Sequence, residues 1–142
     1  MTSLDTAVAD VTKLGFDTSP FIYFIERNPS YLPVTREIFR RVDTGAFVGY
    51  SSTITVTEVL VHPKKRPNRL LEREYRDLLL YGRNFTLISI DVDVAESAAE
   101  LRARYNLRTP DALQIAAARH ASCEAFPTND LSLQRVTELL GQ

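Results

Sequence analysis

Four acidic residues, Asp17, Glu58, Asp111 and Asp130, stand where short apolar runs give way to turns or helix starts. They are far apart in the sequence, yet in a folded α/β domain they could meet at one edge of a sheet. Carboxylates gathered in one cleft repel one another, by roughly 1–4 kcal/mol per close pair at a surface-like dielectric. A divalent cation relieves this repulsion, and Mg²⁺ or Mn²⁺ prefers oxygen ligands. The four acids therefore indicate metal-assisted phosphoryl chemistry.

The neighbours of two of these acids fit the same chemistry. Hydroxyl and amide groups beside a ligand can support it from outside the coordination sphere of a hard cation. The residues predicted for this supporting role are Thr18, Ser19, Thr128 and Asn129.

Each acid also has an interpretation that needs no function. Asp17 and Asp130 suit helix caps and turns, and Asp111 in a first helical turn gains from the helix dipole. Glu58 is harder to explain in this way, because it interrupts the apolar stretch 54–61. A half-buried carboxylate there would need a cationic partner, a metal ion or a proton.

The pattern of apolar runs and helix signals predicts a three-layer α/β/α sandwich around a mainly parallel sheet. A polar lead covers residues 1–12, and a single domain covers 13–142. The predicted strands are 14–16, 46–51, 86–90 and 123–128. The predicted helices are 18–26, 32–43, 54–61, 69–82, 94–105, 109–121 and 132–140.

Ligands in such folds bind beyond the carboxyl ends of the strands. Asp17 and Asp130 directly follow the first and last predicted strands, and Glu58 follows the second by one turn of chain. Asp111 lies in the first turn of the helix that leads into the last strand. It can join the other acids only if that helix begins near the cleft, which the residues alone leave open.

Composition and motifs exclude several other classes. No apolar run reaches the roughly 20 residues of a membrane helix, and no secretory signal is visible, so a cytoplasmic location is expected. The lone Cys123 allows neither an internal disulfide nor a cysteine-based metal cage, and no Gly-rich phosphate loop is present. A receiver domain would need paired acids after the first strand and a late lysine. A phosphatase with an aspartate nucleophile would need a second aspartate two residues after Asp17.

Four segments resemble the acidic motifs of PIN domains, and the closest resemblance is to the VapC-type ribonuclease toxins of toxin–antitoxin pairs. The resemblance extends over residues 14–140. The segments are GFDTSPFIYFIE at 15–26, SSTITVTEVLVHP at 51–63, LRTPDALQIAAA at 107–118 and FPTND at 126–130.

This resemblance implies a PIN fold and metal-dependent endonucleolytic cleavage of RNA. Asp17, Glu58, Asp111 and Asp130 would be the catalytic, metal-binding quartet, with Mg²⁺ or Mn²⁺ as cofactor, and the Asp111 helix would begin at the cleft. The alternative is a non-catalytic PIN-like protein that binds RNA or a partner.

The resemblance also implies a cognate antitoxin as partner. The apolar helix faces at 21–25 and 32–42 could contact that antitoxin or a second copy in a homodimer, or they could be ordinary core. Cationic side chains at the rim would hold the RNA, although interleaved acids make a solvated helix face equally compatible with the basic run. The candidate RNA-binding residues are Lys64, Lys65, Arg66, Arg69 and Arg108.

Overall fold

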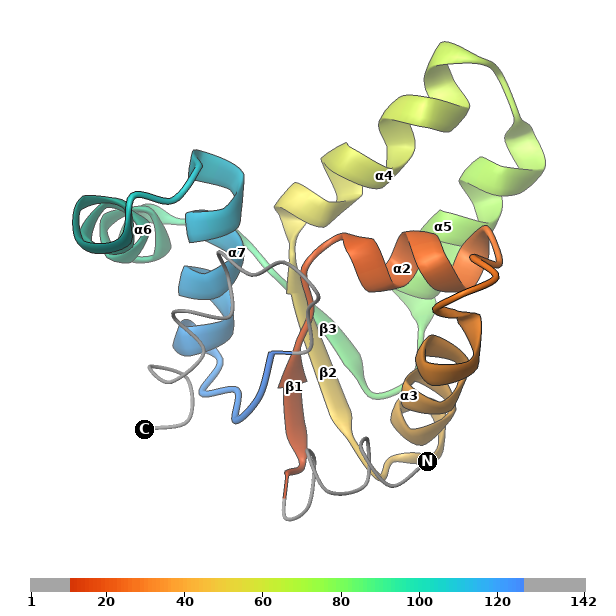
Figure 1. Ribbon diagram of the computed structural model, residues 1–142, viewed down its shortest axis with the longest axis horizontal. Coiled ribbons are helices and arrows are strands. Elements are labelled where there is room, and N and C mark those ends of the chain that lie inside the picture. Colours follow the sequence, from red (N-terminus) through yellow and green to blue (C-terminus); the bar gives the residue numbers. More distant parts are fainter. Residues whose placement is uncertain (1–10, 127–142) are drawn as a thin grey trace.

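The computed structural model of the chain describes residues 11–126, which are coloured in Figure 1. Within this part, three parallel strands form a sheet in the order β1-β2-β3. Their carboxyl ends therefore lie at one edge of the sheet. Each strand lies within two residues of its prediction, and the bounds are β1 Lys13–Gly15, β2 Val48–Ser52 and β3 Phe85–Ile88.

The predicted fourth strand begins on the free side of β1. Ala125 forms a parallel bridge with Leu14, and the Gly15 amide donates a hydrogen bond to the Ala125 carbonyl at 2.9 Å. The neighbouring amide of Phe16 instead donates to Tyr50 on β2, at 2.8 Å. Residues beyond 126, including the predicted helix 132–140, lie outside the described residues.

Helices cover both faces of the sheet, which confirms the three-layer sandwich. α6 and α7 pack on one face and α2, α3 and α5 on the other, while α4 and α5 form a hairpin that extends past the sheet (Figure 1). The bounds are α2 Ser19–Ile25, α3 Leu32–Thr44, α4 Thr53–Lys65, α5 Arg69–Tyr81, α6 Val92–Tyr105 and α7 Thr109–His120.

The two cores differ in the size of their side chains. On the α2/α3 side, the ring of Phe16 lies 5.6 Å from that of Phe21 and 5.3 Å from that of Phe39. These phenylalanines are buried, so this part of the apolar faces at 21–25 and 32–42 is ordinary core. On the other side, α7 packs so close to β1 that a Cβ added at Gly15 would stand 2.7 Å from the Cβ of Ala118.

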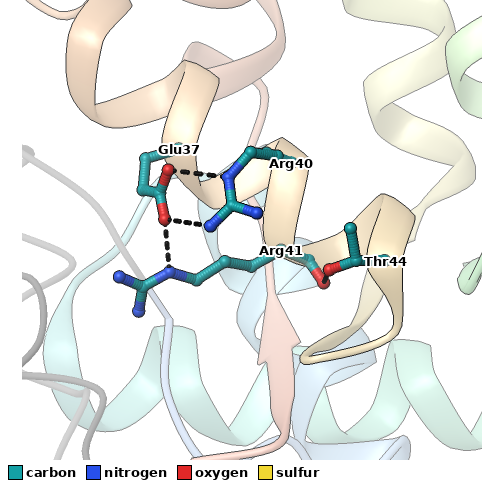
Figure 2. Close-up of polar contacts among 4 residues, drawn as sticks. All are labelled: Glu37, Arg40, Arg41 and Thr44. Atoms are coloured by element: carbon teal, nitrogen blue, oxygen red, sulfur yellow. Dashed lines mark hydrogen bonds and ion pairs between the residues drawn. The ribbon is translucent and has the colours of Figure 1, made fainter.

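Local chemistry sets the helix ends as the sequence indicates. Gly45 ends α3 in the left-handed conformation, at φ 89°, which glycine adopts without steric cost. Asp91 caps α6, because its carboxylate accepts a hydrogen bond from the Val94 amide at 2.9 Å. On the outer side of α3, Glu37 accepts hydrogen bonds from Arg40 and Arg41 (Figure 2).

The basic segment after Glu58 differs from its prediction. The predicted helices 54–61 and 69–82 left a basic loop between them, which contains Pro63 and Pro67, but α4 continues through Pro63 to Lys65. The missing amide of Pro63 removes a single helical hydrogen bond, and its ring is buried. Only residues 66–68 connect α4 to α5.

No helix within residues 11–126 combines the length and the apolar character that crossing a bilayer requires.

Candidate functional site at the carboxyl edge of the sheet

Asp17 lies at the carboxyl edge, between β1 and α2, and is 7% exposed. The strand before it and the helix after it fix its backbone. The N-cap of α2 is Thr18, whose hydroxyl makes no capping hydrogen bond. Ser19 is the half-buried first residue of α2. Capping therefore does not occupy the Thr18 hydroxyl, which can serve the site.

The Thr18 hydroxyl donates a hydrogen bond to the carboxylate of Glu58 on α4. The half-buried position expected for Glu58 is wrong, because Glu58 is exposed. α4 is apolar on more than one side, so periodicity does not select the inward face; packing against α5, α7 and β2 does. The residues that α4 buries are Thr55, Val59, Leu60 and Pro63.

α7 begins at the same edge of the sheet, as the resemblance implied for Asp111. Gln114 accepts a hydrogen bond from Ser52 at the carboxyl end of β2. Ala118, one turn later, packs on Gly15, which pairs with Tyr50, two residues before Ser52 on β2. The helix therefore runs antiparallel to the strands, and Asp111 in its first turn lies at their carboxyl edge.

Arg108 holds the Asp111 carboxylate with two hydrogen bonds, of 3.0 and 3.3 Å. The side chain of Arg108 is 77% exposed and that of Asp111 only 14%. A charged guanidinium thus already occupies the mouth of the site beside one of the predicted metal ligands.

A buried network of hydroxyl and amide groups joins the elements that carry these acids. Gln114 Nε2 donates to Thr55 at 2.8 Å and to Thr18 at 3.2 Å, and its Oε1 accepts from Ser52 at 2.6 Å. The Ser51 hydroxyl donates to the Phe16 carbonyl at 2.9 Å and lies 2.9 Å from the Thr55 hydroxyl.

The hydroxyl groups of this network can all be satisfied at once. Thr18 donates to Glu58 and Ser51 donates to the Phe16 carbonyl, so the Thr55 hydroxyl can donate to the Ser51 oxygen at 2.9 Å or to the Thr18 oxygen at 3.3 Å. Both amide protons of Gln114 are then used on threonine oxygens. Satisfied buried networks of this kind rigidify their surroundings, so Thr18 reaches Glu58 from a fixed position.

Sequence reasoning missed the members of this network other than Thr18. Ser51 was predicted only as the end of a strand and Thr55 only as part of a helix. Ser52 lay between these two predicted elements, and Gln114 was one residue of an alanine-rich helix. The sequence did contain a signal for this network. A glutamine in the apolar run Ala112–Ala118 is expected to be buried, and a buried side-chain amide needs hydrogen-bond partners. The sequence could not say which hydroxyls would receive it.

The donor set matches a hard cation in type, since Asp17, Glu58 and Asp111 all offer carboxylate oxygens. Within residues 11–126, however, no three or more Asp, Glu, His or Cys side chains are grouped so as to hold a metal ion. Asp130, with Thr128 and Asn129, lies outside the described residues. A cation would have to displace Arg108 from Asp111, and the four-ligand set stays a prediction.

The predicted RNA-binding cations lie at two places. Arg108 is at the mouth of the site, whereas the others surround the tip of the α4–α5 hairpin (Figure 1). Lys64 and Lys65 stand on the last turn of α4, about 10 Å along the helix axis from Glu58. Arg66 follows α4, and Arg69 begins α5.

Cys123 does not supply a nucleophile at neutral pH. It is buried beneath α7, and burial raises the pKa of its thiol to about 12. The nucleophilic form of cysteine is the thiolate, so cysteine-based catalysis is excluded.

The sequence profile of the PIN domain family matches residues 16–139. No curated protein sequence matches the chain.

Three solved structures resemble the fold. One, a toxin–antitoxin complex from Klebsiella pneumoniae, is 27% identical with a TM-score of 0.64 and covers 84% of this chain and 87% of that one. VapBC2 from Rickettsia felis, bound to a DNA fragment from its promoter, is 16% identical with a TM-score of 0.66 and covers 88% and 93%. VapC20 from Mycobacterium tuberculosis, a toxin that cleaves the Sarcin-Ricin loop, is 13% identical with a TM-score of 0.71 and covers 88% and 95%.

Proposed function

Because the chain belongs to the PIN domain family, we propose that it is an endoribonuclease that hydrolyses RNA phosphodiester bonds with Mg²⁺ or Mn²⁺. Its biological role in this proposal is that of a VapC-type toxin in a toxin–antitoxin pair. The similarity to three solved structures of such toxins supports that role.

One observation carries the proposal for this site. Hydrogen bonds among Thr18, Glu58, Thr55 and Gln114 tie together the elements that bear three widely separated acids. The Thr18 hydroxyl, itself bonded to Gln114, would hold the exposed Glu58 carboxylate in position for chemistry.

In the proposed reaction, Asp17, Glu58, Asp111 and Asp130 hold the divalent cation. When bound, such an ion supplies charge for the scissile phosphate and lowers the pKa of an attacking water. Thr18 orients Glu58, and Gln114 keeps Thr18 in place. Arg108 lies where its guanidinium can transfer from Asp111 to a phosphate oxygen of the RNA, a group that arginine binds bidentately.

The decisive experiment compares Asp17→Asn with Asp43→Asn, an equal change of charge at an exposed position on α3. With Mg²⁺ or Mn²⁺, the parent chain and Asp43→Asn should cleave RNA, and Asp17→Asn should not. Without metal, Asp17→Asn should be at least as stable as the parent, because one repelling charge is gone. A strongly destabilised Asp17→Asn protein would instead mean that Asp17 has a structural role.

Metal binding has a readout that does not depend on cleavage. A divalent cation that binds only the native state raises stability by about 2.7 kcal/mol at a hundred times its Kd. The rise in Tm should appear in the parent and in Asp43→Asn and be absent from Asp17→Asn. RNA binding without cleavage, and without any metal-dependent rise, would favour the alternative of a non-catalytic PIN-like protein.

The proposed macromolecular partner is a cognate antitoxin, encoded by a small neighbouring reading frame. Co-expression should yield a complex in which RNA cleavage is inhibited. The homodimer stays a prediction, which sedimentation of the purified chain would measure.

A further inference from the structure

The outer side of α5 carries three arginines in one row. Arg69, Arg73 and Arg76 are spaced by four and three residues, so they lie on the same side of the helix. All three are exposed. They stand on the hairpin that extends past the carboxyl edge of the sheet (Figure 1), beyond the site described above.

This row is part of a concentrated positive charge. The segment 64–77 holds six cations and three carboxylates, whereas the chain as a whole has a net charge of −1. Within the described residues, Lys64 is the only one of these six cations that forms an ion pair, with Glu72 at 3.4 Å. The three arginines of α5 therefore form no ion pair within the described residues, and their guanidinium groups are exposed to a ligand.

A shallow hollow of about 330 Å³ runs along this side of α5. Tyr81 stands at its far end and is 78% exposed, so its ring is accessible to a ligand. The residues that line the hollow are Arg69, Glu72, Arg73, Arg76, Asp77 and Tyr81.

These groups match the chemistry of a single nucleic acid strand. Arginine forks bind phosphate oxygens, and an exposed aromatic ring offers a face on which a base can stack. At about 1.5 Å per residue, the row from Arg69 to Arg76 extends about 10 Å and reaches Tyr81 after about 18 Å.

We propose that the α5 row, Arg69, Arg73 and Arg76 with Tyr81, binds a single-stranded segment of the RNA substrate outside the cleavage site. The inference rests on the proposed function, because it assigns this surface to the RNA that the site would cut. RNA is favoured over a protein partner because cations outnumber carboxylates in the segment 64–77, by six to three, although Glu72 and Asp77 also line the hollow.

The test measures binding without cleavage. A fluorescent single-stranded 12-nucleotide RNA is titrated with the full chain in EDTA, and anisotropy is followed from 50 to 200 mM salt. The variant Arg69→Gln/Arg73→Gln/Arg76→Gln is compared with Arg36→Gln/Arg104→Gln/Arg119→Gln. The control changes the net charge equally, at exposed positions on α3, α6 and α7.

Each phosphate contact on a single strand contributes about 0.7 to the slope of log K against log salt. Loss of three contacts should lower the slope by about 2 and weaken binding on the order of 100-fold at 50 mM salt. The control should lose only a few-fold, because separated exposed charges are screened. Tyr81→Ala should weaken binding about tenfold and leave the slope unchanged, as stacking predicts.

Several outcomes would overturn the inference. It is wrong if the parent binds no RNA in EDTA, if both triple variants lose affinity equally, or if the α5 variant binds as the parent does. A change of oligomeric state or of antitoxin capture without a change in RNA affinity would assign the row to a protein partner.

Failure here can be told apart from failure of the proposed function. If the parent binds RNA through the α5 row but cleaves none, the enzyme proposal fails and the binding surface stands. If the α5 variant cleaves RNA with the KM of the parent, the binding surface fails and the enzyme proposal stands.

Discussion

Replacing Thr55 with valine removes one buried hydroxyl and almost no volume. Thr55 is fully buried; its hydroxyl accepts a hydrogen bond from Gln114 and lies 2.9 Å from that of Ser51. In Thr55→Val, one N–H of Gln114 loses its acceptor and the hydrogen bond between Ser51 and Thr55 is lost. A buried donor left without a partner costs about 1–3 kcal/mol.

Urea unfolding of the metal-free chain measures this cost. We expect Thr55→Val to lower the free energy of unfolding by about 1–3 kcal/mol, with an unchanged m value. Thr57→Val is the matched control, because Thr57 is exposed on the same helix, and it should stay within about 0.5 kcal/mol of the parent. Equal stability of the two variants would refute the buried network.

A double-mutant cycle separates the network from the general effect of losing a hydroxyl. Thr55→Val and Gln114→Leu remove two partners of one hydrogen bond, so their combined cost should fall short of the sum by about 0.5–3 kcal/mol. Additive costs would show that the two side chains do not act together. Loss of the Thr55 hydroxyl should also loosen Gln114 and, through it, Thr18. RNA cleavage by Thr55→Val should therefore fall even under conditions in which the variant is fully folded.

Three further predictions concern other sites. Arg108→Gln frees the Asp111 carboxylate, so the affinity for Mn²⁺ should increase by up to about fivefold, which corresponds to the free energy of a largely exposed ion pair. The rise in Tm with Mn²⁺ concentration measures this affinity, and weaker binding would contradict the competition between Arg108 and the metal. Cys123, whose pKa is raised to about 12 by burial, should react with a thiol reagent at pH 8 only as fast as the chain unfolds. Hydrogen bonds from two arginines lower the pKa of Glu37 to about 2, so its stabilisation is present above its ordinary pKa of 4.5 and is lost as the pH falls towards 2. The stability difference between the parent and Glu37→Gln should therefore shrink over that range in urea titrations, and a constant difference would refute the assignment.

Much of the fold follows from signals that act over a few residues. Gly45 could be recognised as the end of α3 because a left-handed residue favours glycine, and the alanines of α7 indicated close packing. The parallel pairing of the strands could be anticipated because helices separate them. The end of α4 was predicted too early because of Pro63. Proline weakens a helix without ending it when only one hydrogen bond is lost.

The acids show where this reasoning stops. Asp17 at the end of a strand and Asp111 at the start of a helix could be identified as site candidates from the sequence. The direction of α7 could not be derived from spacing, and the resemblance to a family supplied it. The exposure of Glu58 was predicted wrongly, because the rotation of an apolar helix depends on the surfaces that flank it.

The sequence by itself determined the elements, the caps and the identity of the acidic side chains, because these depend on chain-local sterics and on residue type. The tertiary structure alone decided that Gln114 meets Thr18 and Thr55, and that Thr18 reaches Glu58. Hydrogen bonds between residues 37 to 96 positions apart require a particular docking of helices on the sheet, and that docking results from packing the whole core rather than from any segment.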